Sequence, residues 1–250
     1  MKRLFIPIIL CALGLSPLSV KAERIRVATP YSMMFAMQDI AKQYERAHPN
    51  ATVQLEIAGS RTLLQRLSAG SQFDVLATAD QTTMDRAAAL GLIDGTTRRD
   101  FARNVLVVAV PAGQSTRVKS LADLKNPRFK RVLVVNPEYG AVGEYAQSAL
   151  KKANAWDAVQ AKAVYSTSLT QSMDLLEFER VDAGLVYETD VRSRRGKVRT
   201  ELYVKTDTSI RYPVAICKCS RDMTESKRFV AYLKGSTARR ILHYYGFQTD

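Results

Sequence analysis

The sequence predicts an α/β fold of two lobes, each a mostly parallel sheet flanked by helices, with a ligand cleft between the lobes. Strand-like runs alternate with helix-like runs along the chain, and this alternation begins afresh near residue 131. Short turns lie where strands are followed by helices, at 27–32, 58–62 and 137–143. Ligands of open α/β sheets bind beyond the carboxyl ends of the strands, so these turns mark the expected cleft.

The first 22 residues have the pattern of a secretory signal peptide. A basic start and a mostly apolar run over 4–18 are followed by a small residue, Ala22, at the expected cleavage point. The apolar run is shorter than the ~20 residues that a membrane anchor needs. A lipid anchor at Cys11 is the alternative, although Leu10 before it is larger than the residue usual in such a signal. We therefore expect an exported, soluble protein of the periplasm.

In the first half of the chain, the predicted elements follow one another in βαβ order. From Met33, apolar residues recur at i, i+4, i+7, i+8 and i+11, which predicts a helix that Pro49 ends. Alternating apolar residues over 53–57 predict a strand, and the continuous apolar run over 105–110 is typical of a strand buried on both faces. The predicted elements are strands at 24–29, 53–57, 73–77 and 105–110, and helices at 32–48, 62–69 and 81–90.

The second half repeats the pattern and then departs from it. Strands are predicted at 131–135, 163–165 and 183–187, helices at 142–152 and 169–179, a pair of extended segments at 198–204 and 211–217, and closing helices at 224–233 and 237–245. The change of order near residue 198 suggests that the chain returns to the first lobe. We therefore expect lobe I to comprise 23–103 and 211–250, and lobe II to comprise 104–210.

The strand-to-helix turns are suited to an anion. Helix N-termini carry unpaired N–H groups and a partial positive charge, so several that converge form an anion site without any formal charge. The formal net charge of the chain is +13, and three of the basic residues lie in the signal peptide. Lys and Arg are scattered, with local clusters at 192–195 and 239–240, and export argues against nucleic acid as a partner. We expect a solvated surface that steers anions mildly.

The sequence offers little for catalysis, metal binding or redox chemistry. It has no Gly-x-Ser-x-Gly elbow, Cys–His pair or clustered carboxylate pair, so we expect no enzyme, and Asp80 is expected to cap a helix. The histidines, His48 and His243, lack further ligands at metal-binding spacing. Cys217 and Cys219 are expected to be a local structural pair or free thiols. No cofactor and no cation site are expected.

Several short motifs carry a resemblance to a known family. Taken together, in order and at compatible spacing, they resemble the periplasmic molybdate-binding proteins of ABC transporters, which have the type II periplasmic-binding fold. The resemblance covers nearly the whole chain after the signal peptide. The motifs are Ala36-Met37-Gln38-Asp39-Ile40-Ala41, Ala77-Thr78-Ala79-Asp80-Gln81 with Met84-Asp85, Gly184-Leu185-Val186-Tyr187, Tyr212-Pro213-Val214-Ala215, and Tyr232-Leu233-Lys234-Gly235 followed by Tyr245-Gly246-Phe247.

The resemblance implies a monomer that binds molybdate, or the related tungstate, and delivers it to an inner-membrane ABC permease. It places two serine hydroxyls at Ser32 and Ser60, amide donors at Val142 and Leu169, and a tyrosine hydroxyl at Tyr187. Independently of the family, the first four of these residues lie at predicted helix starts and Tyr187 ends a predicted strand. Two alternatives stay open: the serines are only N-caps, and the tyrosine is only a core aromatic.

The chain departs from the family pattern beside these residues at Tyr31, at Arg61 and at Ala141, which stands where the family commonly has a proline. Tyr31 stands where the family has small residues and would narrow the pocket. Arg61 follows Ser60 where the family has a small polar residue, and a guanidinium in the cleft would favour carboxylate or phosphate. The other interpretation is that Arg61 points to solvent. A receptor for another oxyanion or a small carboxylate is therefore the alternative function, followed by an exported α/β enzyme.

Overall fold

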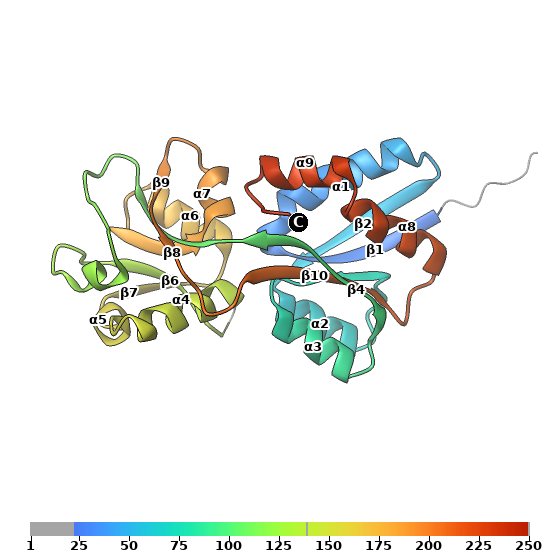
Figure 1. The fold of residues 1–250 in the computed structure, drawn as a ribbon, viewed down its shortest axis with the longest axis horizontal. Coiled ribbons are helices and arrows are strands. Elements are labelled where there is room, and N and C mark those ends of the chain that lie inside the picture. The colour runs from blue at the N-terminus through green and yellow to red at the C-terminus, as the bar shows by residue number, and fades with distance from the viewer. Residues whose placement is uncertain (1–22, 139, 250) are drawn as a thin grey trace, which may run out of the picture.

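The computed structural model describes residues 23–138 and 140–249 and contains two five-stranded sheets side by side, each with helices on both faces (Figure 1). The predicted signal peptide, 1–22, lies outside the described residues. We call the first sheet with its helices the first lobe, and the second sheet with its helices the second lobe. No helix in the described part of the chain is long and apolar enough to cross a membrane.

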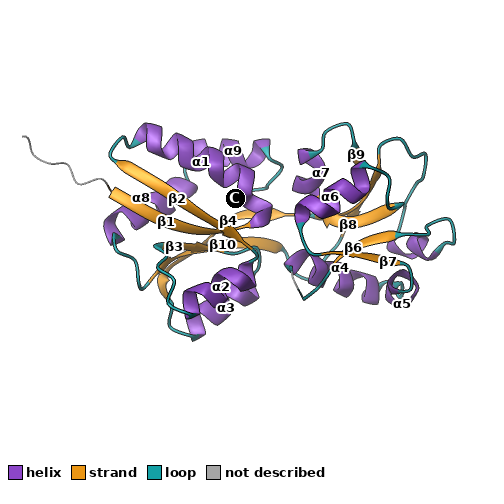
Figure 2. Cartoon of the chain, turned by 180° about the vertical axis from the view of Figure 1, so that it is seen from behind, coloured by secondary structure: helices purple, strands orange, loops and turns teal. Residues whose placement is uncertain are grey.

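The first lobe is built on a mixed sheet with the strand order β2-β1-β3-β10-β4. β1 pairs in parallel with β2 and β3, whereas β10 pairs antiparallel with β3 and β4. Helices α1, α8 and α9 lie over one face, and α2 and α3 over the other (Figure 2). The elements are β1 (Glu23–Pro30), α1 (Met34–Ala47), β2 (Ala51–Ala58), α2 (Ser60–Ser68), β3 (Val75–Ala77), α3 (Gln81–Ala89), β4 (Ile93–Asn104), β10 (Ile210–Cys217), α8 (Met223–Leu233) and α9 (Ser236–Tyr244).

The second lobe repeats this plan with the strand order β7-β6-β8-β5-β9. β6 pairs in parallel with β7 and β8, and β5 pairs antiparallel with β8 and β9. The predicted strand over 105–110 is confirmed, because β5 is buried along its whole length. The elements are β5 (Leu106–Pro111), β6 (Val132–Val135), α4 (Ala141–Lys152), α5 (Trp156–Gln160), β7 (Ala163–Ser166), α6 (Leu169–Glu177), β8 (Ala183–Tyr187), α7 (Glu188–Ser193) and β9 (Val198–Val204).

The chain crosses between the lobes twice. β4 ends at Asn104 and β5 begins at Leu106, while β9 ends at Val204 and β10 begins at Ile210. β5 and β10 are thus the strands that enter a lobe from the other one, and each runs against the other strands of its sheet. A strand that enters from the neighbouring lobe starts at the edge where the parallel strands end. This is why sheets expected to be mostly parallel are mixed.

Some elements have no counterpart in the sequence analysis. β4 is the longest, and its middle carries Arg98, Arg99 and Asp100 in place of an apolar alternation. β4 exists because it pairs along β10, with shifts of register, at the edge of the sheet. Short helices α5 and α7 and a 3₁₀ turn at Leu121–Lys125 were also not predicted. The two extended segments near the end of the chain, expected as a pair, are β9 and β10 and belong to different sheets.

The two cysteines among the described residues, Cys217 and Cys219, lie at and just after the end of β10. Both are free thiols, which is one of the two states that the sequence predicted for them. Burial raises the pKa of the Cys217 thiol far above its usual range, so this thiol stays protonated and packs as a small apolar group. The Sγ of Cys219 lies 3.3 Å from the carbonyl oxygen of Phe73. Both side chains therefore serve the packing of the first lobe.

Candidate functional site

A cavity of ≈ 80 Å³ lies between the lobes, at the carboxyl ends of the parallel strands. Pockets for drug-sized ligands measure about 300–1,000 Å³, so this cavity suits a much smaller ligand. Ser32, Ser60, Val142, Leu169 and Tyr187 all line it. The other lining residues are Pro30, Tyr31, Gly59, Ala79, Val135, Gly140, Ala141, Thr167 and Ser168.

Ser60 is the first residue of α2 and not its N-cap. Gly59 holds the N-cap position, and no side chain caps this helix. The Oγ of Ser60 instead accepts a hydrogen bond of 2.9 Å from the backbone N–H of Ala79. Because that N–H occupies the oxygen as an acceptor, the hydroxyl hydrogen stays available to donate to a ligand.

Ser32 is held in the same way by a chain of buried groups. It lies within the 3₁₀ turn Tyr31–Met33 and caps neither that turn nor α1. The hydroxyl of Tyr212 donates to Ser32 Oγ at 3.0 Å, and Tyr212 accepts from the side-chain amide of Asn104 at 3.1 Å. Burial raises the pKa of Tyr212 above its usual range, so its hydroxyl keeps its proton.

The direction of this chain of hydrogen bonds is fixed at its far end. The backbone N–H of Val105 donates to Oδ1 of Asn104 at 2.9 Å, which turns the amide nitrogen of Asn104 toward Tyr212. The same nitrogen also donates to Thr189 Oγ1 at 2.9 Å. Since each group accepts on one side and donates on the other, the hydroxyl hydrogen of Ser32 is left for the cavity.

Tyr187 ends β8 and presents a buried hydroxyl without a protein partner. Its side chain is 2% exposed, and the hydroxyl has no hydrogen-bond partner among the described residues. Burial raises the pKa of Tyr187 well above its usual range, so the group is a neutral donor. Leaving such a group unsatisfied costs about 1–3 kcal/mol. A tyrosine that only filled the core would gain nothing from a hydroxyl here.

Two helices of the second lobe begin at the cavity. No side chain caps α4, whose N-cap is Gly140, and Ser168 caps α6 through the N–H of Gln171 at 3.2 Å. The start of α4 packs directly on the end of β6, since a Cβ at Gly143 would lie 2.2 Å from the carbonyl oxygen of Val135. The N-termini of both helices bring N–H groups and positive dipole ends to one side of the cavity.

No described residue that lines the cavity carries a formal charge. Asp80 follows the lining residue Ala79 but caps α3, as predicted. Its carboxylate accepts a hydrogen bond of 2.6 Å from the backbone N–H of Thr83. Hydroxyls and helix N-termini therefore supply the polarity of the cavity. Such a set of neutral donors can stabilise an anion and offers no acid–base pair.

Three buried residues around the cavity were missed by the sequence analysis: Asn104, Tyr212 and Asp190. Tyr212 and Ser32 are separated by 180 positions, and Tyr212 and Asn104 by 108, so no local pattern connects them. Asp190 accepts from the backbone N–H of Tyr187 at 3.1 Å, and burial raises the pKa of its carboxyl to about 7. Only the motif around Tyr212 gave any signal, and it did not indicate a role.

Of the two residues proposed to tune the ligand, Tyr31 lines the cavity and Arg61 does not. The sequence analysis left Arg61 either in the cleft or in solvent. The structure leaves it exposed and outside the cavity, where its guanidinium pairs with Glu144 of the second lobe and donates to the carbonyl oxygen of Glu138 at 3.1 Å. Its charge therefore faces a carboxylate and not the cavity.

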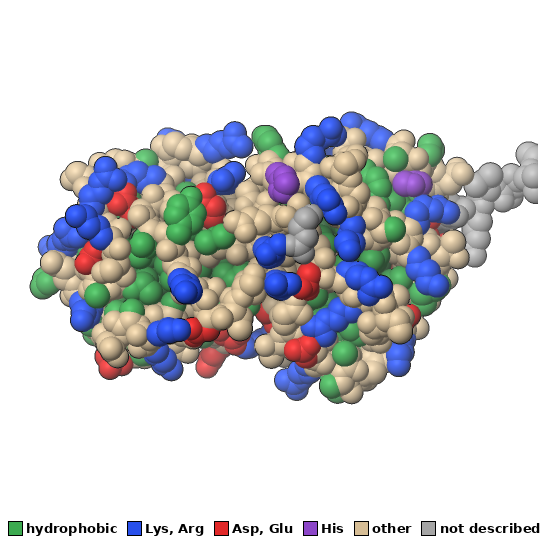
Figure 3. Space-filling view, in the orientation of Figure 1, with side chains coloured by type: hydrophobic (Ala, Val, Ile, Leu, Met, Phe, Trp, Pro, Cys, Tyr) green, Lys and Arg blue, Asp and Glu red, His purple; other side chains and the backbone are tan. Residues whose placement is uncertain are grey.

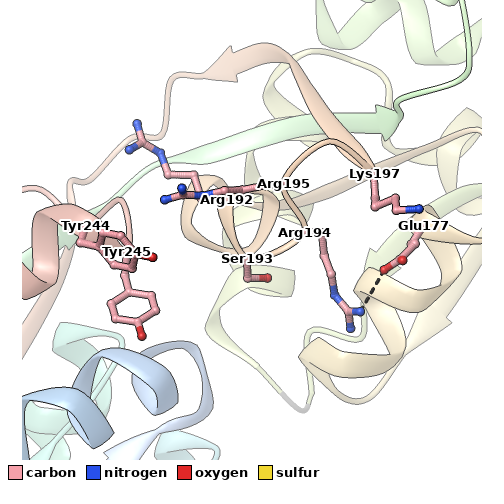
Figure 4. Close-up of a pocket in the computed structure, with 8 residues that line it drawn as sticks. All are labelled: Glu177, Arg192, Ser193, Arg194, Arg195, Lys197, Tyr244 and Tyr245. Atoms are coloured by element: carbon pink, nitrogen blue, oxygen red, sulfur yellow. Dashed lines mark hydrogen bonds and ion pairs between the residues drawn. The ribbon is translucent and has the colours of Figure 1, made fainter.

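A larger, basic pocket of ≈ 480 Å³ lies between the end of α7 and the end of α9 (Figure 4). Arg194 is paired with both Asp174 and Glu177, and Arg192 with Glu188. Arg195 lies over the ring of Tyr244, 5.2 Å from its centre. Basic side chains are common near helix C-termini, where they stabilise the negative end of the dipole. Lys and Arg are also spread over both lobes on the face that Figure 3 shows, so this pocket is part of a generally basic surface.

Comparisons with known proteins agree with this geometry. The family model described as bacterial extracellular solute-binding protein matches residues 25–248. The molybdate-binding protein ModA of Escherichia coli (strain K12) is 32% identical over 229 residues, which cover 90% of this chain and 88% of that protein. Among solved structures, the periplasmic molybdate-binding protein of Azotobacter vinelandii has a TM-score of 0.78 at 17% identity and covers 90% of this chain and 99% of its own.

A second solved structure shows how far the fold extends beyond one ligand. The sulfate-binding protein SubI from Mycobacterium tuberculosis H37Rv has a TM-score of 0.75 at 14% identity, covering 91% of this chain and 87% of its own. At such identities the two structures show the fold alone. They confirm the predicted α/β fold of two lobes.

Proposed function

The chain belongs to the bacterial extracellular solute-binding protein family, and from this premise we propose that it captures molybdate, or the related tungstate, for an ABC permease. The name of the relative at 32% identity supports this ligand. In this proposal Ser32, Ser60 and Tyr187 donate through their hydroxyls, and Val142 and Leu169 through their backbone amides. The protein works in the periplasm as a monomer, without a cofactor.

The observation that carries the proposal is the state of the three hydroxyls. Two of them accept a hydrogen bond from a fixed donor, and the third has no partner among the described residues, so all three hold a hydrogen for the cavity. A fully deprotonated oxyanion has only acceptors and matches this set. A protonated anion such as hydrogen phosphate carries an O–H that would need an acceptor, and an unpaired buried O–H is penalised.

The size of the anion gives a second level of selection. Molybdate, tungstate and sulfate share their charge and tetrahedral shape, so fixed donors leave the smaller sulfate with longer and weaker hydrogen bonds. The alternative of a small carboxylate depended on Arg61 in the cleft, and Arg61 faces Glu144 instead. An exported enzyme would need an acid–base pair, and the described lining residues offer none.

Capture would proceed by closure of the lobes about the two strand crossings, at Asn104–Leu106 and 204–210. The first lobe brings two hydroxyls to the anion, and the second brings two helix N-termini and Tyr187. Together these donors replace the hydration shell of the anion in a cavity closed to bulk water. Opening of the lobes at the permease would return the anion to water.

An anion screen on the purified protein, residues 23–250, tests the proposal. We expect molybdate and tungstate to raise the melting temperature strongly, sulfate weakly, and phosphate and small carboxylates hardly at all. A ligand at a hundred times its Kd stabilises the folded state by about 2.7 kcal/mol. Calorimetry then gives each Kd. Stabilisation by a carboxylate or phosphate, with none by molybdate, would contradict the proposed ligand.

A further inference from the structure

Arg61 reaches from the first lobe to the second. It follows Ser60 on α2, and its guanidinium pairs with the carboxylate of Glu144 on α4. Its Nη1 also donates to the carbonyl oxygens of Glu138 at 3.1 Å and Pro137 at 3.4 Å. All of these partners belong to the second lobe, so the lobes cannot separate at this edge until the contacts of Arg61 break.

These contacts join the two walls of the cavity without entering it. Ser60 lines the cavity from the first lobe, and Arg61 is the next residue. On the second lobe, Pro137 and Glu138 precede Gly140, Ala141 and Val142, which also line the cavity. Arg61 thus fastens the start of α2 to Pro137, Glu138 and the first turn of α4, beside the cavity but outside it.

The chemistry of the side chain suits this role. The planar guanidinium donates to a carboxylate and to carbonyl oxygens at once, which the single ammonium of a lysine does with less geometric fit. The pair is exposed, with 51% of the Arg61 side chain and 44% of the Glu144 side chain accessible. An exposed ion pair shifts an equilibrium by about two- to fivefold, and the additional bonds to carbonyl oxygens extend this to about tenfold.

We propose that Arg61 is a latch, which holds the closed lobes together and so sets how long the bound anion stays. The proposal rests on the proposed function. Because the latch forms only when the lobes meet, it stabilises the closed state whatever the anion, and the gain falls mainly on the dissociation rate. Arg61 therefore raises the affinity for every accepted anion by the same factor and leaves their ranking unchanged.

The same helix supplies a matched control. Arg66 lies on α2 as well, and it also forms an exposed ion pair, with Glu56 on β2. Both of these residues belong to the first lobe, so their contact does not change when the lobes open. Arg66→Ala removes a comparable charge and ion pair from the same helix without touching the contact between the lobes.

The experiment compares wild type, Arg61→Ala, Glu144→Gln, the charge swap Arg61→Glu with Glu144→Arg, and Arg66→Ala. Calorimetry gives the Kd for molybdate, tungstate and sulfate, and stopped-flow displacement gives the dissociation rate of molybdate. We expect Arg61→Ala to weaken all three anions about three- to tenfold and to speed dissociation by a similar factor. Glu144→Gln should act in the same direction, the swap should recover part of the loss, and Arg66→Ala should match wild type.

Two results would overturn the latch. Either Arg61→Ala binds and releases molybdate like wild type, or it changes the ratio of the molybdate and sulfate affinities, which would mean that Arg61 acts on the anion itself. A wild-type protein that binds none of the anions would instead contradict the proposed function. The two failures are thus distinguishable in one set of measurements.

Discussion

The two lobes share a sheet plan but bring different donors to the cavity. The first lobe supplies two serine hydroxyls, and each is held by a protein donor, Ala79 N–H for Ser60 and Tyr212 for Ser32. The second lobe supplies two helix N-termini and the hydroxyl of Tyr187, which has no hydrogen-bond partner among the described residues. The first wall is therefore preorganised, whereas the second has a donor that gains its partner only with a ligand.

This difference suggests an order of events. An anion that meets the first lobe finds its two hydroxyls already oriented, so little reorganisation opposes the first contact. Closure of the second lobe then lowers the free energy further. The buried hydroxyl of Tyr187 has no hydrogen-bond partner before closure and forms a charge-assisted hydrogen bond with the anion after it. Substitutions in each lobe test this order, and the expected change in affinity decreases from Ser60 to Tyr187 and then to Tyr212.

Ser60→Ala should have the largest effect, because it removes a preorganised donor of the first lobe. A hydrogen bond to a charged group contributes roughly 1.5–3 kcal/mol, so we expect the molybdate Kd to rise about tenfold or more. Titration calorimetry measures the change. Ser68→Ala, at the exposed end of the same helix, is the control and should bind like wild type. If Ser60→Ala keeps the wild-type Kd, Ser60 serves only to bond Ala79.

Tyr187→Phe should change affinity and stability in opposite directions. The loss of the hydroxyl should weaken molybdate binding about tenfold. Without ligand, the variant should be more stable by up to about 1 kcal/mol, because it no longer buries an unpaired hydroxyl. Urea unfolding with and without molybdate gives both values, and Tyr203→Phe on the exposed part of β9 is the control. A loss of stability without ligand would show that Tyr187 has a protein partner in solution.

Tyr212→Phe should weaken binding about three- to fivefold, less than the loss of a direct donor. The variant keeps Ser32 but removes the donor that fixes its direction, so the hydroxyl of Ser32 must be oriented when the anion binds. Tyr245→Phe removes another tyrosine hydrogen bond from the first lobe, the one to Asp39, and should leave the Kd unchanged. Equal affinities of Tyr212→Phe and wild type would show that the first wall needs no preorganisation.

The pH dependence of stability should reveal the buried carboxyl behind Tyr187. Burial raises the pKa of Asp190 to about 7 from an ordinary 3.8, so between these values the folded state holds a proton that the unfolded state releases. This group therefore stabilises the fold most below pH 4, and its contribution falls as the pH rises to about 7. Above pH 7 its contribution no longer changes.

Asp190→Asn should remove this part of the pH dependence. Melting curves from pH 4.5 to 8 measure the effect. The melting temperature of the variant should rise relative to that of wild type as the pH increases, and the difference should become constant near pH 7. Asp157→Asn, on the exposed side of α5, is the control and should follow wild type at each pH. Parallel curves for Asp190→Asn and wild type would mean that Asp190 is ionised throughout the range. Asn104 and Tyr212, which support Ser32 in the first lobe, do not change charge between pH 4.5 and 8. They should therefore contribute nothing to the pH dependence of stability in this range.

The local order of helices and strands in this protein could be predicted from its sequence. Apolar patterns predicted α1, β2 and the buried strand β5, because burial on one face or both leaves a repeat or an unbroken apolar run within a few residues. Strand ends followed by helix starts predicted where a ligand would lie. The motif resemblance then selected five residues that the structure brings to one cavity. The apolar patterns and the turns are each contained in a short stretch of chain, and the resemblance is carried by short motifs in a fixed order along it.

How these stretches meet depends on contacts between residues that are far apart in the chain. The edge strand β4 has no pattern of its own and forms because β10 offers a partner. Tyr212 orients Ser32 across 180 positions of the chain, and Arg61 finds its partners 76 and 77 positions away. Such contacts follow from the packing of the two lobes, and a local pattern does not encode them because many distant residues are chemically able to serve. The position of Arg61 beside the cavity therefore depends on the carboxylate of Glu144, with which it pairs across the lobes.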